Sequence, residues 1–313
     1  MVKHYKIENN KLTECQREES ALIVYIAPPE EEINEIIQQY QIDEHDVHSS
    51  LDPNELSRIE FEDEYTLLIL KRPENYSSNN LLFKVNSLGI FLQQGKMIVV
   101  LAEDIQLLEG RQFSKLRTPG DILIKILYGT ISHFLGHLKV INMVSEELEQ
   151  KINTSMENKY LINMFVLEKS LVYYLDGINS NAKVIDKIKL NVNKIGFTAE
   201  NIDTLEDIII ENQQCQKQAE IYLNILTGLM DARGSIVNNN LSILIKRLTI
   251  INIIFMPLNL LAGIGGMSEF SMMTQGADWR ITYALFLLGM VGLGFLTYFF
   301  MNYLISKIGP ERK

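Results

Sequence analysis

Polar residues recur at helical spacing inside an apolar stretch near the C-terminal end of this chain. Asn252 and Asn259 stand seven positions apart, and the intervals around them alternate between three and four. The members of this polar stripe are Ser242, Ile245, Thr249, Asn252, Met256, Asn259 and Gly263. Such intervals place all of them on one helix face. Rings of amide oxygens and thioethers suit a cation that keeps its water, but the same spacing is typical of a helix-packing seam. The stripe alone leaves both interpretations open.

The stripe lies in the first of two segments that predict membrane spans. Residues 248–264 and 281–305 contain no charged side chain, and the hydrocarbon core of a bilayer requires about 20 such residues per helix. The first segment is short, but the preceding residues can complete it. Asn252 and Asn259 are costly in hydrocarbon unless they meet protein or water, so their face must point inward. One chain with two spans cannot enclose a pore, so a pore requires several copies around an axis.

The basic residues around the spans predict their orientation. Lys246 and Arg247 precede the first span, and Lys307, Arg312 and Lys313 follow the second. The linker 265–280 contains one basic residue, Arg280. Because cytoplasmic flanks are enriched in Lys and Arg, we expect a protein of the cell membrane with both termini cytoplasmic and the linker outside.

The composition excludes several other classes of protein. The formal charge of −10 argues against a nucleic-acid partner, because phosphate backbones require a positive surface. Cys15 and Cys215 lie far apart without a CxxC spacing, as expected for free thiols in a reducing compartment. The N-terminal residues resemble no secretory signal. No nucleotide-binding, nucleophile or metalloprotease motif is present, so we expect no enzymatic activity and no covalent cofactor.

The region before the spans predicts an α/β domain followed by long helices. Residues 21–27 indicate a strand, followed by a helix that begins after Pro28 and Pro29. Further strands are expected at 57–63, 65–71, 83–92 and 96–102, and helices at about 120–156, 159–190 and from 200 onward. No proline occurs from Ala199 to Met256. A continuous helix of that length would extend roughly 90 Å and lead directly into the first span.

These patterns predict an α+β membrane protein with six consecutive parts. They are a cytosolic α/β domain (1–118), cytosolic long helices (119–198), a stalk helix continuing into the pore-lining span (199–264), an outer loop (265–280), a second span (281–306) and a basic cytosolic tail (307–313).

The sequence from Ile253 to Phe270, IIFMPLNLLAGIGGMSEF, resembles the CorA family of divalent-metal channels. The similarity extends to residues 57–73, 123–152 and 244–257. That resemblance implies a funnel-shaped homopentamer whose inner helices line the pore and whose GMN motif forms the outer entrance for hydrated Mg²⁺. It implies hydrophobic constrictions at Met256 and Leu248. The expected pore lining is then Ser242, Ile245, Leu248, Thr249, Asn252, Met256, Asn259 and Gly263.

The sequence departs from the family pattern at two sites. At the entrance, Gly265, Gly266, Met267 and Ser268 stand where YGMN is expected. We expect Gly266, Met267, Ser268 and Glu269 to form this entrance, with a serine hydroxyl in place of an amide. The resemblance also implies a regulatory metal between neighbouring protomers. Asp207 matches one of its two carboxylates, but Ser49 stands at the other, so the site would be rebuilt from Glu206, Asp46 or Asp52 and gating by internal Mg²⁺ would be weaker.

Three further patterns have structural explanations. His133 and His137 are four residues apart, as in some metal sites, but no third ligand is evident and packed or solvated histidines are expected. Glu146, Glu147 and Glu149 indicate a solvated face that could concentrate cations near a pore mouth. Gly289, Gly292 and Gly294 indicate helix packing.

The functional hypothesis is a passive channel for hydrated divalent cations, with Mg²⁺ first and Co²⁺ or Ni²⁺ next. Membrane potential would drive the ion inward, and the chain itself and the bilayer would be its partners. The alternatives are a Zn²⁺ or other divalent-metal transporter of the same fold, and a non-conducting membrane scaffold or cation sensor.

Overall fold

The structure is a computed structural model of the chain. It describes residues 1–74, 81–93, 95–105, 107–108, 115–154, 158–276 and 278–308. The chain divides into two compact units, Met1–Met230 and Asp231–Lys313, which are described separately.

The first unit contains a sheet of seven strands among the described residues, in the order β2-β1-β3-β7-β6-β5-β4. The strands are β1 (Val2–Glu8), β2 (Lys11–Glu14), β3 (Leu22–Ile26), β4 (Arg58–Phe61), β5 (Thr66–Pro73), β6 (Val85–Gln93) and β7 (Lys96–Leu101). β3 and β7 pair in parallel, and the other neighbours are antiparallel. All five predicted strands are confirmed. β1 and β2 were not predicted, because their many charged residues obscure the alternation of a strand.

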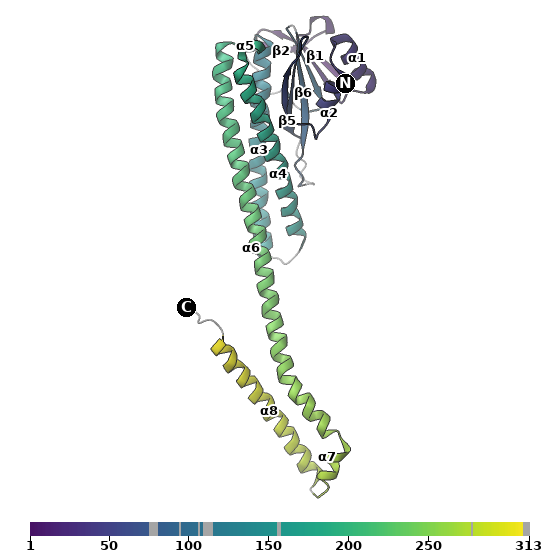
Figure 1. The fold of residues 1–313 in the computed structure, drawn as a ribbon, viewed down its shortest axis with the longest axis vertical. Coiled ribbons are helices and arrows are strands. Elements are labelled where there is room, and N and C mark those ends of the chain that lie inside the picture. The colour runs from purple at the N-terminus through teal and green to yellow at the C-terminus, as the bar shows by residue number, and fades with distance from the viewer. Residues whose placement is uncertain are drawn as a thin grey trace. The chain divides into compact units, whose positions relative to one another are not determined.

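Both faces of the sheet are covered by helices (Figure 1). Successive residues of β3 point to opposite faces: Ile23 and Tyr25 join one hydrophobic cluster, and Leu22 and Val24 join the other. α1 (Glu30–Tyr40) and α2 (Glu44–Leu51) cover the first face, and a short 3-10 helix (Arg17–Glu19) precedes β3. The helix after Pro29 is confirmed, whereas α2 was not predicted.

The second face of the sheet is covered by α3 (Pro119–Thr154) and α4 (Asn158–Leu190), close to their predicted bounds. After the short α5 (Val192–Ile195), α6 runs from Ala199 to Gly265. The first part of α6 packs beside α3 and α4, where Leu205, Ile208 and Cys215 are buried (Figure 1). Cys15 and Cys215 are both free thiols, as predicted.

The second unit contains the remainder of α6, then α7 (Ser268–Met273) and α8 (Trp279–Ile308). α6 continues through Pro257 to Gly265, so the helix is longer than the proline-free run. The expected outer loop contains the short helix α7. α6 and α8 each contain a window long and apolar enough to cross a membrane, and none of either window is buried among the described residues. Apolar helices without cover in water are unfavourable, which supports a lipid or protein environment.

Candidate ion pathway

The residues of the expected pore lining are all exposed on α6. Ser242, Ile245, Leu248, Thr249, Asn252, Met256, Asn259 and Gly263 all belong to the exposed class. The exposed fraction is 77% for Met256, which no other part of the described chain covers. The stripe is thus available to water or to further copies of the chain.

The two hydroxyl groups of the stripe are oriented by their own helix. The Oγ of Ser242 donates to the carbonyl of Asn238 at 2.9 Å, and the Oγ1 of Thr249 donates to the carbonyl of Ile245 at 2.9 Å. Because each hydroxyl proton points back to the helix, the remaining lone pairs of each oxygen are left as acceptors. An oxygen that accepts is suited to the water molecules around a cation, whose hydrogens point outward.

The two asparagines of the stripe differ from these hydroxyls. The side chains of Asn252 and Asn259 make no hydrogen bond to any described residue of the chain. Each exposed amide therefore keeps an oxygen acceptor and two N–H donors for groups outside this chain. In hydrocarbon such an amide would be unsatisfied, so each requires water or another protein surface.

The entrance residues follow the C-terminal end of α6. The backbone N–H of Gly266 donates to Ala262 at 3.1 Å and that of Met267 donates to Ile264 at 3.1 Å, which closes the last turn. The Oγ of Ser268 donates to the Oε2 of Glu269 at 3.2 Å. The C-terminal end of a helix has partial negative charge, and Glu269 adds a full one. The entrance is therefore electrostatically suited to cations.

An aromatic contact beside the entrance was not predicted from the sequence. A Cβ added at Gly265 would lie 2.6 Å from the Cζ of Phe286 on α8. The ring of Phe286 also lies 5.5 Å from that of Phe270 on α7, measured between centroids. Gly265 thus allows three elements of the second unit to meet. The sequence signal was present, since glycine replaces a tyrosine of the family motif, but the partner could not be inferred.

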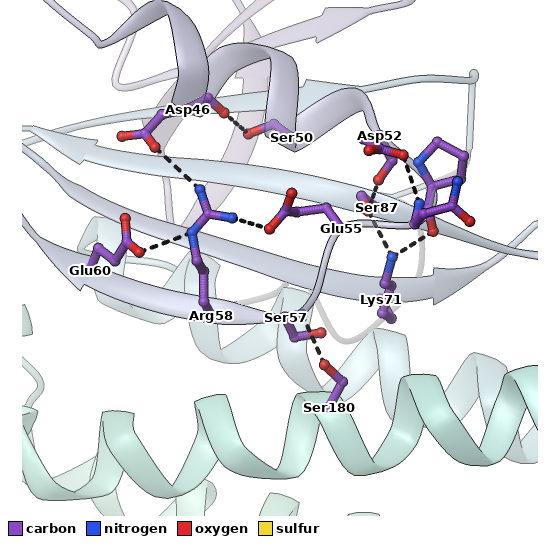
Figure 2. A network of polar contacts seen from close by, with 12 residues as sticks. Asp46, Ser50, Asp52, Glu55, Ser57, Arg58, Glu60, Lys71, Ser87 and Ser180 are labelled. Carbon is purple, nitrogen blue, oxygen red and sulfur yellow. Dashed lines mark hydrogen bonds and ion pairs between the residues drawn. The ribbon is translucent and has the colours of Figure 1, made fainter.

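Asp46, one of the candidate carboxylates of the regulatory site, bonds to other side chains of its own domain. Asp46 is buried on α2; its Oδ2 accepts from the hydroxyl of Tyr65 at 2.6 Å, and its Oδ1 accepts from Arg58 at 3.3 Å. Arg58 also contacts Glu55 and Glu60 (Figure 2). Burial and the bond to Asp46 raise the pKa of Tyr65 above its ordinary value. The Asp46 carboxylate is therefore already occupied by partners within the chain.

The other regulatory candidates are more accessible. Glu206 and Asp207 are exposed on α6, where Glu206 pairs with Lys189 at 3.3 Å. The Oδ1 of Asp52 accepts a hydrogen bond from the backbone N–H of Asn54 at 2.8 Å. Ser49, which stands at the expected carboxylate position, is buried. The α2 and α6 candidates lie on opposite faces of the sheet (Figure 1). Within the described residues no three His, Cys, Asp or Glu side chains form a group that could hold a metal.

Of the two histidines of α3, His137 is buried and His133 is half-buried beside it. Their rings lie 4.3 Å apart, and the Nδ1 of His137 lies 2.6 Å from the hydroxyl of Tyr174. Burial lowers the pKa of both His133 and His137 to about 4, with Arg72 adding to the effect. Both are therefore neutral near pH 7, which agrees with the interpretation as packed histidines.

The remaining sequence patterns are the glutamates of α3 and the glycines of α8. Glu146 and Glu147 are exposed, where they contact Asn142 and Lys151 on their own helix. The backbone of Gly294 lies against Leu258 of α6, as expected for a packing glycine. A Cβ at Gly289 or Gly292 would meet no described atom within 4 Å, so this chain alone does not explain those two.

The sequence of the chain matches a known protein family over most of its length. Residues 22–303 match the family described as CorA-like Mg²⁺ transporter protein. The chain belongs to the CorA family. Since this is a family of transporters, membership also confirms the expectation that the chain is not an enzyme. The resemblance to the CorA family is confirmed.

Individual relatives agree with this assignment. The chain is 25% identical over 255 residues to the cobalt/magnesium transport protein CorA of Methanocaldococcus jannaschii, covering 77% of each chain. The complete CorA structure from that organism is similar with a TM-score of 0.74 and 21% identity, covering 98% of this chain and 97% of the other. The cytoplasmic domain of ZntB from Vibrio parahaemolyticus is similar with a TM-score of 0.59 and 15% identity, covering 76% of this chain and 98% of that domain. The fold class is therefore that of CorA.

Proposed function

We propose that this CorA-family protein forms a homopentameric pore that conducts hydrated divalent cations, with Mg²⁺ as the principal ion. The observation behind this proposal is the polar stripe of α6, in which Asn252 and Asn259 are exposed and make no hydrogen bond to a described residue, within a segment apolar enough to cross a membrane. Five copies is the number that the CorA resemblance implies. Around one axis, they would present five amides at each of the two levels.

The chemistry of the stripe favours an ion that keeps its water. Mg²⁺ dehydrates reluctantly, so neutral oxygens that accept from its hydration shell suit it better than a tight cage of charges. The hydroxyl oxygens of Ser242 and Thr249 are such acceptors. Glu269 and the C-terminal end of α6 would concentrate cations before they enter.

Membrane potential is a sufficient driving force for this function. A divalent cation gains about 4.6 kcal/mol per 100 mV, twice the value for a single charge. With both termini cytoplasmic, as the basic flanking residues predict, transport would run from the entrance inward. No ATP-hydrolysing site is required.

A regulatory metal between protomers is part of the proposal, with Asp207 as its first ligand. The bonds of Asp46 to Tyr65 and Arg58 make it a poor second ligand. Asp52 and Glu206 are better candidates for the second ligand, because their carboxylates are exposed.

The test is ion flux into liposomes that contain the full-length protein and a trapped Mg²⁺ indicator. Replacement of Asn259 by Leu removes amide acceptors at one level of the pore, so we expect Mg²⁺ influx to fall at least several-fold. The matched control is Asn302→Leu, which changes an asparagine of α8 outside the stripe. Equal flux from wild type and Asn259→Leu would contradict a pore lined by this stripe.

Transport of Zn²⁺ is the second candidate, because Ser268 stands where the entrance motif has asparagine. Parallel measurements with a Zn²⁺ indicator distinguish the two: Zn²⁺ flux without Mg²⁺ flux would favour this candidate. Absence of flux for both ions, in protein shown to be folded and inserted, would favour the scaffold or sensor.

A further inference from the structure

A cavity of about 530 Å³ lies in the first unit. It is lined by the end of α2 and the segment after it, by β5 and β6, by the residues following β7, and by α4. Its size falls within the range typical of small-molecule sites, roughly 300–1,000 Å³. Neither the polar stripe nor the candidate regulatory carboxylates line it.

Lys71 is the buried charge of this cavity. The residue is 4% exposed, and its Nζ donates to the carbonyl of Pro53 at 2.6 Å and to the Oγ of Ser87 at 3.0 Å (Figure 2). An ammonium group has three N–H donors, so one remains. Lys71 forms no ion pair with a carboxylate of the described residues. Burial lowers its pKa, and the carboxylates of Asp52, Asp176 and Glu55, which lie beyond ion-pair distance, act in the opposite direction. Its two hydrogen-bond acceptors are neutral, so an anionic group at the third N–H would complete the surroundings of this buried cation.

Three carboxylates of the cavity lining have the opposite charge to Lys71. They belong to Glu74, Glu103 and Asp176, and none of the three forms an ion pair with a described residue. Burial and the nearby Glu103 raise the pKa of Glu74. With Lys71 and Lys84 the lining contains two positive and three negative groups, a net charge of −1. A polyanion would be repelled, whereas a ligand with one carboxylate and two cationic groups matches both signs.

The spacing of these charges also suits such a ligand. Lys71 lies on β5, and Glu74 directly follows the last residue of that strand. Three residues of extended chain separate their backbones by about 10 Å. Tyr173, which is 49% exposed, and Val85 add apolar surface to the lining. An extended side chain of several methylene groups could lie along that surface.

We propose that this cavity binds a basic amino acid, with the α-carboxylate on Lys71 and the side-chain cation beside Glu74, Glu103 and Asp176. Lys71 holds the carbonyl of Pro53, and Ser87 donates to the carbonyl of Asp52 at 2.5 Å. The ligand would therefore also order the segment that follows α2. Binding does not depend on ion conduction, so its failure would leave the proposed transport function unaffected.

The experiment is isothermal titration of the full-length protein in detergent with L-arginine and L-lysine as probes. Agmatine, which is arginine without the carboxylate, should bind about tenfold more weakly, because it cannot bond to the Lys71 ammonium. Asp176→Asn should weaken L-arginine binding several-fold. Asp186→Asn is the matched control, because Asp186 is exposed on the same helix outside the cavity.

Lys71→Gln should abolish the preference for arginine over agmatine. If that variant does not fold, as judged by its melting temperature, the agmatine and Asp176 comparisons still decide the matter. The proposal is overturned if wild type binds neither amino acid at millimolar concentration, if agmatine binds as well as arginine, or if Asp176→Asn and Asp186→Asn behave alike.

Discussion

The ring of Phe286 lies against the backbone of Gly265, where a Cβ would come within 2.6 Å of its Cζ. The contact joins α8 to the end of α6, next to the residues expected to form the pore entrance. Phe270 of α7 completes the cluster. The position of the expected entrance thus depends on a residue that has no side chain.

We predict that Gly265→Ala displaces Phe286, lowers stability by about 1–3 kcal/mol and reduces Mg²⁺ influx. Thermal unfolding in detergent and liposome flux measure the two effects. Phe286→Ala should restore space, so the double variant should recover part of the stability lost in Gly265→Ala. Gly292→Ala is the control, because a Cβ there meets no described atom within 4 Å. Equal effects at positions 265 and 292 would contradict the contact.

A second prediction concerns the hydroxyl of Thr249. Thr249→Val keeps the shape of the side chain but removes its oxygen, so a pore that uses this acceptor should lose several-fold in Mg²⁺ influx. Thr249→Ser should retain most of the flux. Thr297 of α8 makes the same kind of bond, to Leu293 at 3.0 Å, and provides a matched control. A loss of flux in Thr297→Val as large as that in Thr249→Val would mean that the helix, not the pore, is affected.

A third prediction separates structural from regulatory carboxylates. Asp46→Asn weakens the bonds to Tyr65 and Arg58 and should reduce the free energy of unfolding by about 1–3 kcal/mol. The internal Mg²⁺ concentration that halves the flux should stay unchanged. Asp207→Asn, on the exposed face of α6, should do the reverse. The assignment fails if Asp46→Asn alters Mg²⁺ inhibition while leaving the melting temperature intact.

A fourth prediction follows from the neutral histidines of α3. Burial lowers the pKa of His133 to about 4 in the folded protein, against an ordinary value of 6.5. The unfolded chain therefore binds a proton first as the pH falls, so stability should decrease from pH 6.5 to about pH 4. Allowing for solvent screening, the loss should be on the order of 1 kcal/mol for this histidine.

The measurement for this fourth prediction is urea unfolding of the full-length protein as a function of pH. His133→Gln should make the dependence between pH 6.5 and 4 less steep without abolishing it, because His137 has the same lowered pKa. His48→Gln, at an exposed position on α2, should leave the dependence unchanged. A profile for His133→Gln that parallels wild type over this range would show that His133 is not held neutral.

Much of the fold could be predicted because the relevant signals lie within single elements. Continuous runs of β-forming apolar residues indicated β3 and β5, and spacing of three and four indicated α3, α4 and α6. Two uncharged segments indicated the spans. The stripe from Ser242 to Gly263 was visible because a helix repeats at 3.6 residues, a property of local backbone geometry.

Other features depended on contacts between distant parts of the chain. The bond of Tyr65 to Asp46, the contact of Phe286 with Gly265 and the bonds of Lys71 to Pro53 and Ser87 each join residues whose spacing in sequence contains no regular signal. These relationships arise from how the sheet, α2 and α4 pack in one unit and how α6 and α8 pack in the other. The sequence by itself determined which helix bears the polar stripe, because helical periodicity is local; only the tertiary structure decided which carboxylates and glycines have partners, because packing brings together residues that periodicity does not relate.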